Sequence, residues 1–483
     1  MRKPLVIILA GLLLITLSTT LTSAKNNINF INNPNIKPVQ TNAKLHVTGK
    51  FADHNTLITQ NSKAYVWGRN YERQLGLGDT TDRYTPTKNT ILEQIIQDNG
   101  GVDNILTLKT SYYHNILIFK NGKAYVWGLN GHGQLGLGDT NERDTPTENT
   151  QLEQIIQDND GVNNILTLET GTIYNILIFK NGKAYVWGAN GGGQLGLGYR
   201  SSSSPYGILT PTENTQLEQI IQDNGGVENI LTLKTGARHN ILIFKNGKVY
   251  VWGWNKYGQL GLGDWTTRDA PTENTQLEQI IQQNGGVNNI LALEIGGYHN
   301  VLIFKNGKVY VWGYNYYSQL GLGDTTNRDT PTENFELEQI IQDNGGAENI
   351  LMLETGGYHN VLIFKNGKVY VWGYNGDGQL GLGDWTSRDT PTENSKLEQI
   401  IQQNGGVENI LMLKTGYEHN ILIFKNGKVY VWGWNNYGQL GLGDTTNRNT
   451  PTENTQLEQL IQENGGVFLG GCSSVTSSIV VLL

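Results

Sequence analysis

The chain has 483 residues and a formal net charge of −8, from 35 basic and 43 acidic residues. A nucleic-acid-binding surface needs clustered lysine and arginine, so this charge balance argues against a nucleic-acid partner. The single cysteine, Cys472, excludes an intrachain disulfide and a Cys-x-x-Cys zinc or redox motif. The 61 glycines and the many Asn-Gly pairs are typical of a turn-rich β protein.

Residues 1–24 have the features of an export signal. Arg2 and Lys3 precede an apolar run from Leu5 to Leu17, which is shorter than the ~20 residues of a membrane-spanning helix. Thr22-Ser23-Ala24 provides a small-residue cleavage site. The alternative is an uncleaved anchor, so we expect membrane attachment only if the signal is retained. In either case we expect the body of the protein to be exported to the periplasm, the cell surface or the medium.

From residue 43 onward the sequence is a repeat. Residues 25–42 are rich in Asn, contain Pro34 and Pro38, and are predicted to be a disordered linker. The motif Tyr-Val-Trp-Gly then begins at Tyr65, Tyr125, Tyr185, Tyr250, Tyr310, Tyr370 and Tyr430. Its period is 60 residues, except for one interval of 65. No unit of this length looks able to bury its faces alone, so we predict one repeat domain over residues 43–483.

The unit at residues 349–402 shows the expected elements. We predict strands at 350–355, 360–365 and 368–373, and a fourth strand from Thr390-Pro391-Thr392. Asn366-Gly367 predicts a tight hairpin turn in which both residues take a positive φ. Since proline cannot donate to a strand ladder, the fourth strand is predicted at the outer edge. The spacing of apolar residues over 397–401 predicts a short amphipathic helix at the rim of the domain.

The second and third strands are apolar at nearly every position, which implies burial on both faces. Four-stranded sheets stacked around an axis meet this demand. We therefore predict an all-β fold, a seven-bladed β-propeller in which each four-stranded blade is followed by a short helix. Residues 43–63 and 467–483 are both weak copies of the first two strands. Either one terminal pair is surplus or the two ends share a blade.

Most differences between repeats fall at one end of the predicted propeller. The turns between first and second strands and the loops between third and fourth strands both lie there. Tyrosine and tryptophan give a large contact area at low entropic cost, so these positions predict a protein-binding surface. The alternative is drift in exposed loops. The candidate binding residues are Tyr71, Tyr112, Tyr113, Arg238, Trp254, Tyr257, Tyr298, Tyr314, Tyr316, Tyr317, Tyr358, Tyr374, Trp434 and Tyr437.

The third unit carries an insert in its loop at this end. Five extra residues within 199–208 explain the 65-residue interval. Tyr199, Arg200, Pro205 and Tyr206 are the candidate contact residues of this insert.

Several short motifs resemble catalytic, nucleotide-binding or metal-binding motifs, but none of them predicts a site. Three Gly-x-Gly-x-x-Gly matches, such as residues 131–136, do not open a helix as dinucleotide binding requires. The histidines that recur before Asn in most units, such as His359, are expected to link blades and not to act as catalysts. Asp324 and its equivalents are expected to stabilise turns, with calcium binding as the alternative. We therefore predict no catalytic residues, no metal site and no cofactor.

The repeat resembles that of the regulator of chromosome condensation family. The similarity covers residues 43–483 through Gly-x-x-His-Asn, Asn-Gly-Lys-Val-Tyr-Val-Trp-Gly and Gly-Gln-Leu-Gly-Leu-Gly-Asp. It implies a seven-bladed propeller whose N- and C-terminal strands share a blade. The units here are longer than is usual in that family, because each carries the additional helix. The export signal is the second departure.

Functions within that family are diverse. They include nucleotide exchange on a small GTPase, ultraviolet sensing, parts of ubiquitin ligases and secreted bacterial inhibitors of β-lactamases. The sequence is best interpreted as an exported, monomeric, non-enzymatic binding propeller of bacterial type with a protein partner. The alternatives are an exchange factor for a small GTPase, acting on a host cell, and a structural envelope protein.

Overall fold

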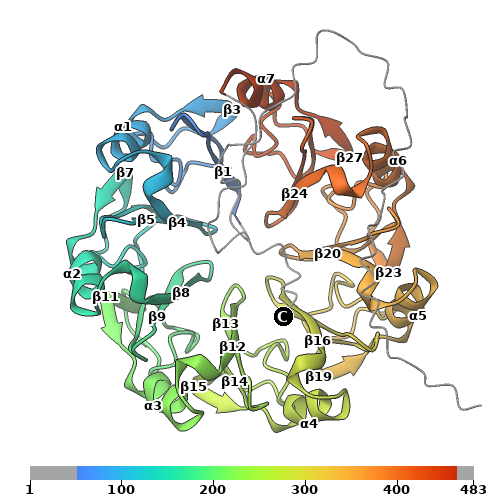
Figure 1. Ribbon diagram of the computed structural model, residues 1–483, viewed down its shortest axis with the longest axis horizontal. Coiled ribbons are helices and arrows are strands. Elements are labelled where there is room, and N and C mark those ends of the chain that lie inside the picture. Colours follow the sequence, from blue (N-terminus) through green and yellow to red (C-terminus); the bar gives the residue numbers. More distant parts are fainter. Residues whose placement is uncertain (1–51, 465–483) are drawn as a thin grey trace, which may run out of the picture. The chain divides into compact units, whose positions relative to one another are not determined.

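The computed structural model describes residues 52–464, which form seven antiparallel sheets arranged in a ring (Figure 1). We number these sheets blades 1 to 7 in chain order. Blade 1 has three strands within the described residues, and the other six have four. The predicted export signal, the linker and the C-terminal copy of the first strands lie outside the described residues.

The strands have the following bounds. Blade 1 contains β1 (His54–Ile58), β2 (Ala64–Gly68) and β3 (Arg83–Lys88), and blade 2 contains β4 (Ile105–Thr110), β5 (His114–Phe119), β6 (Ala124–Gly128) and β7 (Arg143–Glu148). Blade 3 contains β8 (Ile165–Thr170), β9 (Tyr174–Phe179), β10 (Ala184–Ala189) and β11 (Gly207–Glu213), and blade 4 contains β12 (Ile230–Thr235), β13 (His239–Phe244), β14 (Val249–Gly253) and β15 (Arg268–Glu273). Blade 5 contains β16 (Ile290–Ile295), β17 (His299–Phe304), β18 (Val309–Gly313) and β19 (Arg328–Glu333). Blade 6 contains β20 (Ile350–Thr355), β21 (His359–Phe364), β22 (Val369–Gly373) and β23 (Arg388–Glu393), and blade 7 contains β24 (Ile410–Thr415), β25 (His419–Phe424), β26 (Val429–Gly433) and β27 (Arg448–Glu453).

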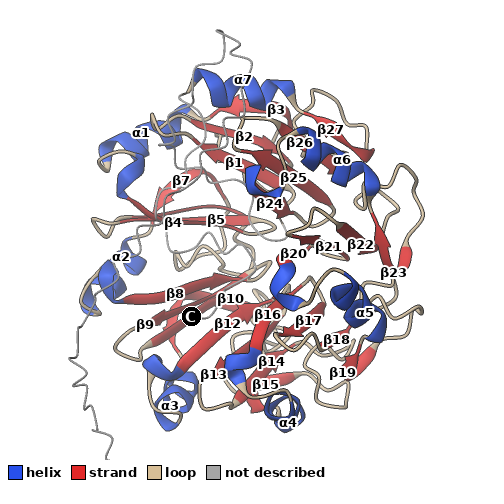
Figure 2. Ribbon diagram, turned by 45° about the vertical axis from the view of Figure 1, so that its right-hand side comes forward, coloured by secondary structure: helices blue, strands red, loops and turns tan. Residues whose placement is uncertain are grey.

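A helix follows each blade and lies at the rim of the ring (Figure 2). The helices are α1 (Thr90–Asp98), α2 (Thr150–Asp158), α3 (Thr215–Asp223), α4 (Thr275–Gln283), α5 (Phe335–Asp343), α6 (Ser395–Gln403) and α7 (Thr455–Glu463). Short 3₁₀ helices, which the sequence did not predict, precede the first strands of blades 2 to 7: η1 (Val102–Asn104), η2 (Val162–Asn164), η3 (Val227–Asn229), η4 (Val287–Asn289), η5 (Ala347–Asn349) and η6 (Val407–Asn409).

Strand order within a blade confirms the sequence prediction. In blade 6 the order is β20-β21-β22-β23, and β20 contacts the first strands of both neighbouring blades. The proline-containing fourth strand, β23, is therefore at the outer edge. The predicted helix at 397–401 lies within α6, whose N-cap Asn394 accepts a hydrogen bond from the Leu397 amide.

The hairpin prediction was wrong in detail. The turn between β21 and β22 contains Asn366-Gly367, but only Gly367 takes a positive φ, of 90°. The Asn366 side chain instead accepts a hydrogen bond from the Lys368 amide at 3.0 Å. The connection is thus four residues long, and the asparagine contributes through its side chain and not through a left-handed backbone.

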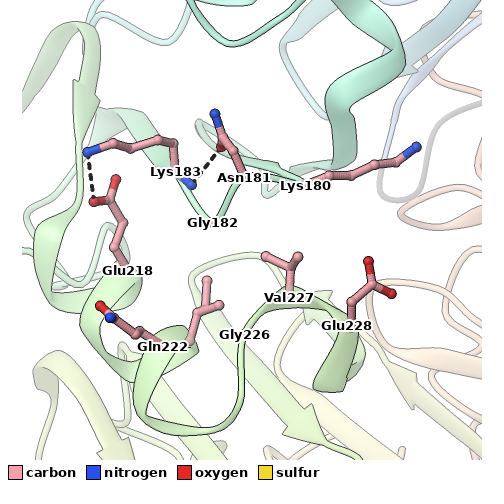
Figure 3. A pocket seen from close by; sticks show the side chains of 10 residues that line it. Lys180, Asn181, Gly182, Lys183, Glu218, Gln222, Gly226, Val227 and Glu228 are labelled. Carbon is pink, nitrogen blue, oxygen red and sulfur yellow. Dashed lines mark hydrogen bonds and ion pairs between the residues drawn. The ribbon is translucent and has the colours of Figure 1, made fainter.

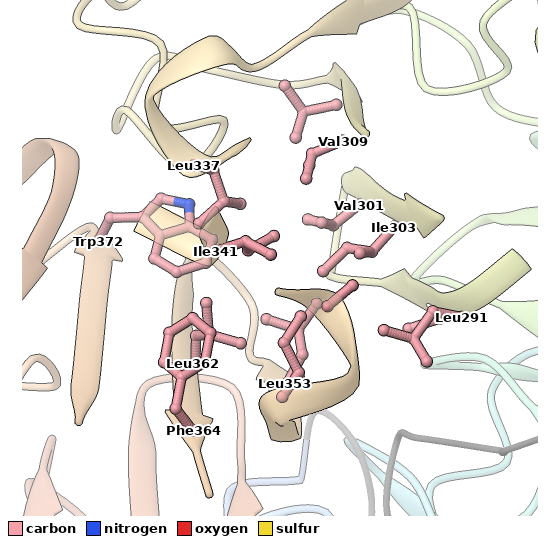
Figure 4. Packing of buried hydrophobic residues seen from close by; sticks show 14 of the residues in the cluster. Leu291, Val301, Ile303, Val309, Leu337, Ile341, Leu353, Leu362, Phe364 and Trp372 are labelled. Atoms are coloured by element: carbon pink, nitrogen blue, oxygen red, sulfur yellow. The ribbon is translucent and has the colours of Figure 1, made fainter. Parts of the chain in front are cut away.

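The hydrophobic core is divided into clusters between neighbouring blades. In the cluster of Figure 4, Val301 and Ile303 of blade 5 and Leu337 and Ile341 of α5 pack against blade 6. The blade 6 side of this cluster includes Trp372, which is fully buried. Each sheet is therefore covered on both faces, which explains the continuous apolar strands. The tryptophans of all seven Tyr-Val-Trp-Gly motifs are core residues.

A buried polar ring, which we call the His–Asn ring, also links the blades. At six of the seven junctions an Asn side-chain oxygen contacts the histidine of the preceding blade. The Nε2–Oδ1 pairs are His54–Asn115 (2.9 Å), His114–Asn175 (2.8 Å), His239–Asn300 (3.0 Å), His299–Asn360 (2.8 Å), His359–Asn420 (2.8 Å) and His419–Asn55 (3.5 Å). In blade 3 the Tyr174 hydroxyl replaces histidine and donates to Asn240 at 2.8 Å. The expectation that these histidines link blades is confirmed.

Within this ring the direction of each hydrogen bond is fixed. The Asn420 amide nitrogen donates to the Gln379 carbonyl at 2.9 Å, and that carbonyl also accepts from Trp432 Nε1 at 3.0 Å. A carbonyl can only accept, so the Asn420 oxygen must face His359, and His359 Nε2 must carry the proton. Each histidine of the ring therefore donates from Nε2 to the asparagine of the next blade.

The contacts between blade 7 and blade 1 show that the described residues close the ring. Asn55 donates to the Gln439 carbonyl at 2.9 Å, and Trp67 Nε1 donates to the same carbonyl at 3.1 Å. These are the bonds that join every other pair of neighbours. The sequence left open how the ring closes. These bonds show that β1 and β2 of blade 1 close it against blade 7.

Candidate functional site

One end of the propeller, which we call the loop face, carries the variable turns and loops. In blade 5, His299 pairs with Gly313, and the Tyr314 amide then donates to the Tyr298 carbonyl at 2.9 Å. Gly313 has φ of 104°, and a side chain there would collide with the Tyr298 carbonyl. The same backbone bond joins the pairs Asp53–Arg69, Tyr113–Leu129, Ile173–Ala189, Arg238–Trp254, Tyr358–Tyr374 and Glu418–Trp434. The structure therefore places the variable turn and the variable loop of each blade side by side, as predicted.

Aromatic rings on the loop face contact one another across several blades. Trp254 lies 5.6 Å from Tyr298, Tyr298 lies 6.2 Å from Tyr358, and Tyr358 lies 5.3 Å from Tyr417. Tyr417 of blade 7 then reaches Tyr112 of blade 2 at 4.9 Å. We call the connected set the aromatic surface: Tyr112, Tyr113, Trp254, Tyr257, Tyr298, Tyr314, Tyr316, Tyr317, Tyr358, Tyr374 and Tyr417.

Two arginines extend the aromatic surface by cation–π contacts. The Arg69 guanidinium lies 5.6 Å from the Tyr113 ring and 4.8 Å from the Tyr437 ring. Tyr437 in turn contacts Trp434 at 5.1 Å. Arg238 lies over Trp254 at 5.5 Å. Arg69 of blade 1 thus lies between rings of blades 2 and 7, whereas Arg238 lies over a ring of its own blade 4.

Most of the predicted binding residues therefore gather in one place. Tyr71 does not join them: its side chain is 72% exposed, and it makes no ring contact among residues 52–464. The prediction missed Tyr417, although the turn Gly416-Tyr417-Glu418 displayed it. It also missed the charged residues Asp53, Arg69 and Glu418. Their positions, directly before the ring histidine or directly after the Tyr-Val-Trp-Gly motif, were the available signal.

Three carboxyl groups lie beside the aromatic surface. They belong to Asp377 of blade 6, Glu418 of blade 7 and Asp53 of blade 1. Burial, together with the Asp53 and Asp377 carboxyls, raises the pKa of Glu418 to about 8. Burial raises the pKa of Asp53 to about 7, and it also raises that of Asp377. Asp377 accepts a hydrogen bond from Asn447 at 3.0 Å, and Arg69 lies 3.9 Å from Asp53. Within the described residues no hydrogen bond or ion pair reaches the Glu418 carboxylate.

The insert of blade 3 is held between its neighbours. The Arg200 guanidinium pairs with Asp269 of blade 4 at 2.7 Å, and the Pro205 carbonyl contacts His132 Nδ1 of blade 2 at 2.7 Å. Tyr199 and Tyr206 remain 51% and 49% exposed. Blade 3 contributes no ring to the aromatic surface, and its insert presents these two tyrosines instead.

A hollow of about 560 Å³ lies at the opposite end, between the blade 3 hairpin and α3 (Figure 3). Lys183 pairs there with Glu218 at 3.2 Å, and its backbone amide donates to the Asn181 side chain at 3.0 Å. The same lysine–glutamate pair recurs beside the other hairpins, for example as Lys308–Glu338 at 3.0 Å. We therefore interpret this hollow as part of the repeated framework.

The aspartate loops hold turns, as expected. Asp324 accepts a hydrogen bond from the Thr326 amide at 2.8 Å and pairs with Arg328 at 2.6 Å. Among residues 52–464 no three His, Cys, Asp or Glu side chains are grouped to hold a metal ion. In the same part of the chain, no helix is long and apolar enough to cross a membrane.

Comparison with known proteins agrees with this architecture. A sequence model of the RCC1-like domain matches residues 200–476, more than half of the chain. The chain belongs to the RCC1-repeat family. Models of the regulator of chromosome condensation (RCC1) repeat also match residues 61–106, 107–134 and 121–158.

Curated relatives and solved structures support the same family and fold. The chain is 28% identical to the ultraviolet-B receptor UVR8 of Arabidopsis thaliana, covering 84% of this chain and 81% of UVR8. It is 26% identical to protein pim1 of Schizosaccharomyces pombe, covering 80% and 69%. The crystal structure of Prp20p from Saccharomyces cerevisiae, described with its binding to Gsp1p and histones, has a TM-score of 0.58. Its sequence identity is 18%, covering 85% of this chain and 87% of that one, so this likeness concerns the fold alone.

Proposed function

We propose that this RCC1-repeat protein is an exported, non-enzymatic propeller that binds a protein partner through the aromatic surface. The observation that carries the proposal is the continuity of that surface. Rings from blades 4, 5, 6, 7 and 2 contact one another on the loop face, while the sheets beneath share one strand order. Large, rigid aromatic side chains on a fixed framework are the usual anchors of protein interfaces.

Exposure of individual rings supports this role. Tyr316 is 64% exposed, although it contacts both Tyr314 and Tyr317. Trp265 and Trp385, in equivalent loops of blades 4 and 6, are 44% and 49% exposed. Exposed aromatic groups that cluster on one face are typical of interaction sites, whereas scattered ones are not.

We expect alanine at Trp254, Tyr298, Tyr316 and Trp434 to weaken partner binding without unfolding the propeller. The four side chains supply contact area but none belongs to the interior of a blade. Residues 25–483 serve as bait against envelope extract and host-cell lysate, and captured proteins are quantified by mass spectrometry. The matched control is Phe335→Ala, because Phe335 is 69% exposed but begins α5 at the opposite end.

A protein enriched by wild type and by Phe335→Ala, but lost with the fourfold variant, supports the proposed site. Capture that is equal with all three baits would exclude the aromatic surface as the binding face. The insert of blade 3, which is held by contacts to blades 2 and 4, is the feature that favours a second candidate, nucleotide exchange on a small GTPase. That candidate requires a captured GTPase whose nucleotide release this protein accelerates, and deletion within 199–208 must abolish the acceleration.

Export is proposed from residues 1–24 alone. We expect the mature chain to begin at Lys25, since Thr22-Ser23-Ala24 is the small-residue site after the apolar run. Intact mass and N-terminal sequencing of protein expressed with its own leader, with fractionation of the cells, test this directly. Protein that remains full-length in the cytosolic fraction would contradict export.

A further inference from the structure

Charge is distributed unevenly around the loop face. The residues directly before the ring histidines, or before Tyr174 in blade 3, form an inner circle: Asp53, Tyr113, Ile173, Arg238, Tyr298, Tyr358 and Glu418. The two acidic members are neighbours across the junction of blades 7 and 1. Asp377 adds a third carboxyl from the blade 6 loop, and its hydrogen-bond partner Asn447 belongs to blade 7. The positively charged member, Arg238, belongs to blade 4.

The chain already seats its own guanidinium groups on these rings. Arg69 occupies the space between Tyr113 and Tyr437, and Arg238 covers Trp254. Both arginines sit where a turn residue and a loop residue of one blade are adjacent. Tyr358, Tyr374 and Tyr417, which belong to blades 6 and 7, have no cation of the described chain over them.

The Glu418 carboxylate is near enough to two of these rings to influence the pKa of their hydroxyls. Burial raises the pKa of Tyr358, and the nearby Glu418 carboxylate adds to the shift. Burial raises the pKa of Tyr374 to about 12, with Asp377 and Glu418 contributing. Tyr417 precedes Glu418 in the turn, and its hydroxyl donates to that of Tyr358 at 2.8 Å. Asp53 is fully buried, and the Arg69 guanidinium lies 3.9 Å from its carboxylate.

We propose that the aromatic surface recognises a basic segment of its protein partner, and that one arginine or lysine side chain lies over Tyr358, Tyr374 and Tyr417 against the Glu418 carboxylate. Rings supply cation–π attraction, and partly desolvated carboxylates supply the countercharge that such a cation needs. Binding of the cation also offsets the repulsion between Glu418, Asp53 and Asp377. This inference rests on the proposed function and names the chemistry of the partner.

The test uses two fluorescein-labelled twelve-residue peptides with the sequence Gly-Ser-X repeated four times. In one peptide X is arginine, and in the other it is citrulline, which has nearly the same shape without the charge. Fluorescence anisotropy with the protein of residues 25–483, at about pH 8.5 where Glu418 and Asp53 are ionised, gives each Kd. We expect the arginine peptide to bind about tenfold more tightly, and Glu418→Gln to remove most of that difference.

A non-specific attraction to an acidic protein must be distinguished from the proposed site. Glu408→Gln is the matched control, since Glu408 is an exposed glutamate of η6, away from the loop face. Equal loss of affinity in Glu408→Gln and Glu418→Gln, or equal affinity for the two peptides, would overturn the inference. Glu418→Gln is expected to fold normally, because it removes a carboxyl whose ionisation in the folded state is unfavourable.

The two proposals fail separately. If partner capture depends on the aromatic residues while both peptides bind equally, the binding face stands and the basic segment is excluded. If the arginine peptide depends on Glu418 but partner capture does not depend on the aromatic residues, the proposed partner site is wrong.

Discussion

Replacing Asn420 by alanine is expected to lower the free energy of unfolding by about 3 kcal/mol or more. Asn420 is fully buried, and its side chain accepts from His359 and donates to the Gln379 carbonyl. Alanine leaves the His359 Nε2 donor without an acceptor and creates a polar cavity. A buried donor left without a partner costs about 1–3 kcal/mol, and the second lost bond and the cavity add to this.

Denaturant unfolding followed by circular dichroism measures the loss. The matched control is Asn436→Ala, since Asn436 belongs to the same blade but is exposed on a loop. We expect that control to lie within about 0.5 kcal/mol of wild type. If the two variants unfolded alike, the His–Asn ring would contribute nothing measurable to the cohesion of the blades.

The propeller fold was predictable because the same strand and turn pattern recurs in all seven repeats. Continuous apolar strands, a proline in each fourth strand and the fixed period led to stacked blades, and the structure confirms them. The hairpin detail at Asn366 was not predictable from its dipeptide. The side-chain bond to Lys368 competes with the backbone geometry that Asn-Gly usually adopts.

The site was predictable in position but not in composition. Strand directions placed Tyr298 and Tyr314 at one end, and the register His299–Gly313 makes them adjacent. The contact between Tyr417 and Tyr112 could not be inferred, since it joins blades that are not neighbours and depends on side chains that reach across the end of the ring. The role of Glu418 likewise could not be inferred. It depends on burial of the carboxyl group, which raises the pKa and cannot be read from a single sequence.

The propeller is expected to unfold cooperatively as the pH falls from about 6.5 to 4. Burial lowers the pKa of His54, His114 and His359 to about 4, and that of His419 to about 3. Between these values and the ordinary 6.5, the unfolded chain binds more protons than the folded one. Stability is therefore fully present above pH 6.5 and is lost as the pH falls towards 4.

Three carboxyl groups of the loop face, Asp53, Glu418 and Asp377, oppose this trend. The pKa of Asp53 and that of Glu418 are raised, so their contribution to stability is largest at low pH and is lost as the pH rises through about 7 and 8. Over the range from 6.5 to 4 they partly offset the histidines. One pKa unit corresponds to about 1.4 kcal/mol, so each histidine contributes at most about 3.5 kcal/mol over that range of about 2.5 pH units. The four histidines outweigh these three carboxyls, and the net effect is acid unfolding.

Blade 3 provides the variant that tests this cause. Its Tyr174 makes the bond to the next blade without a group that titrates between pH 4 and 7, and the glycine three residues earlier leaves room for the ring. Blade 6 has the equivalent Gly356, so His359→Tyr is expected to keep the bond to Asn420. Its stability at pH 7.5 should change little, whereas its acid midpoint, measured by circular dichroism, should move to lower pH. An unchanged midpoint would show that protonation of the His–Asn ring does not drive unfolding, and that carboxylates elsewhere do.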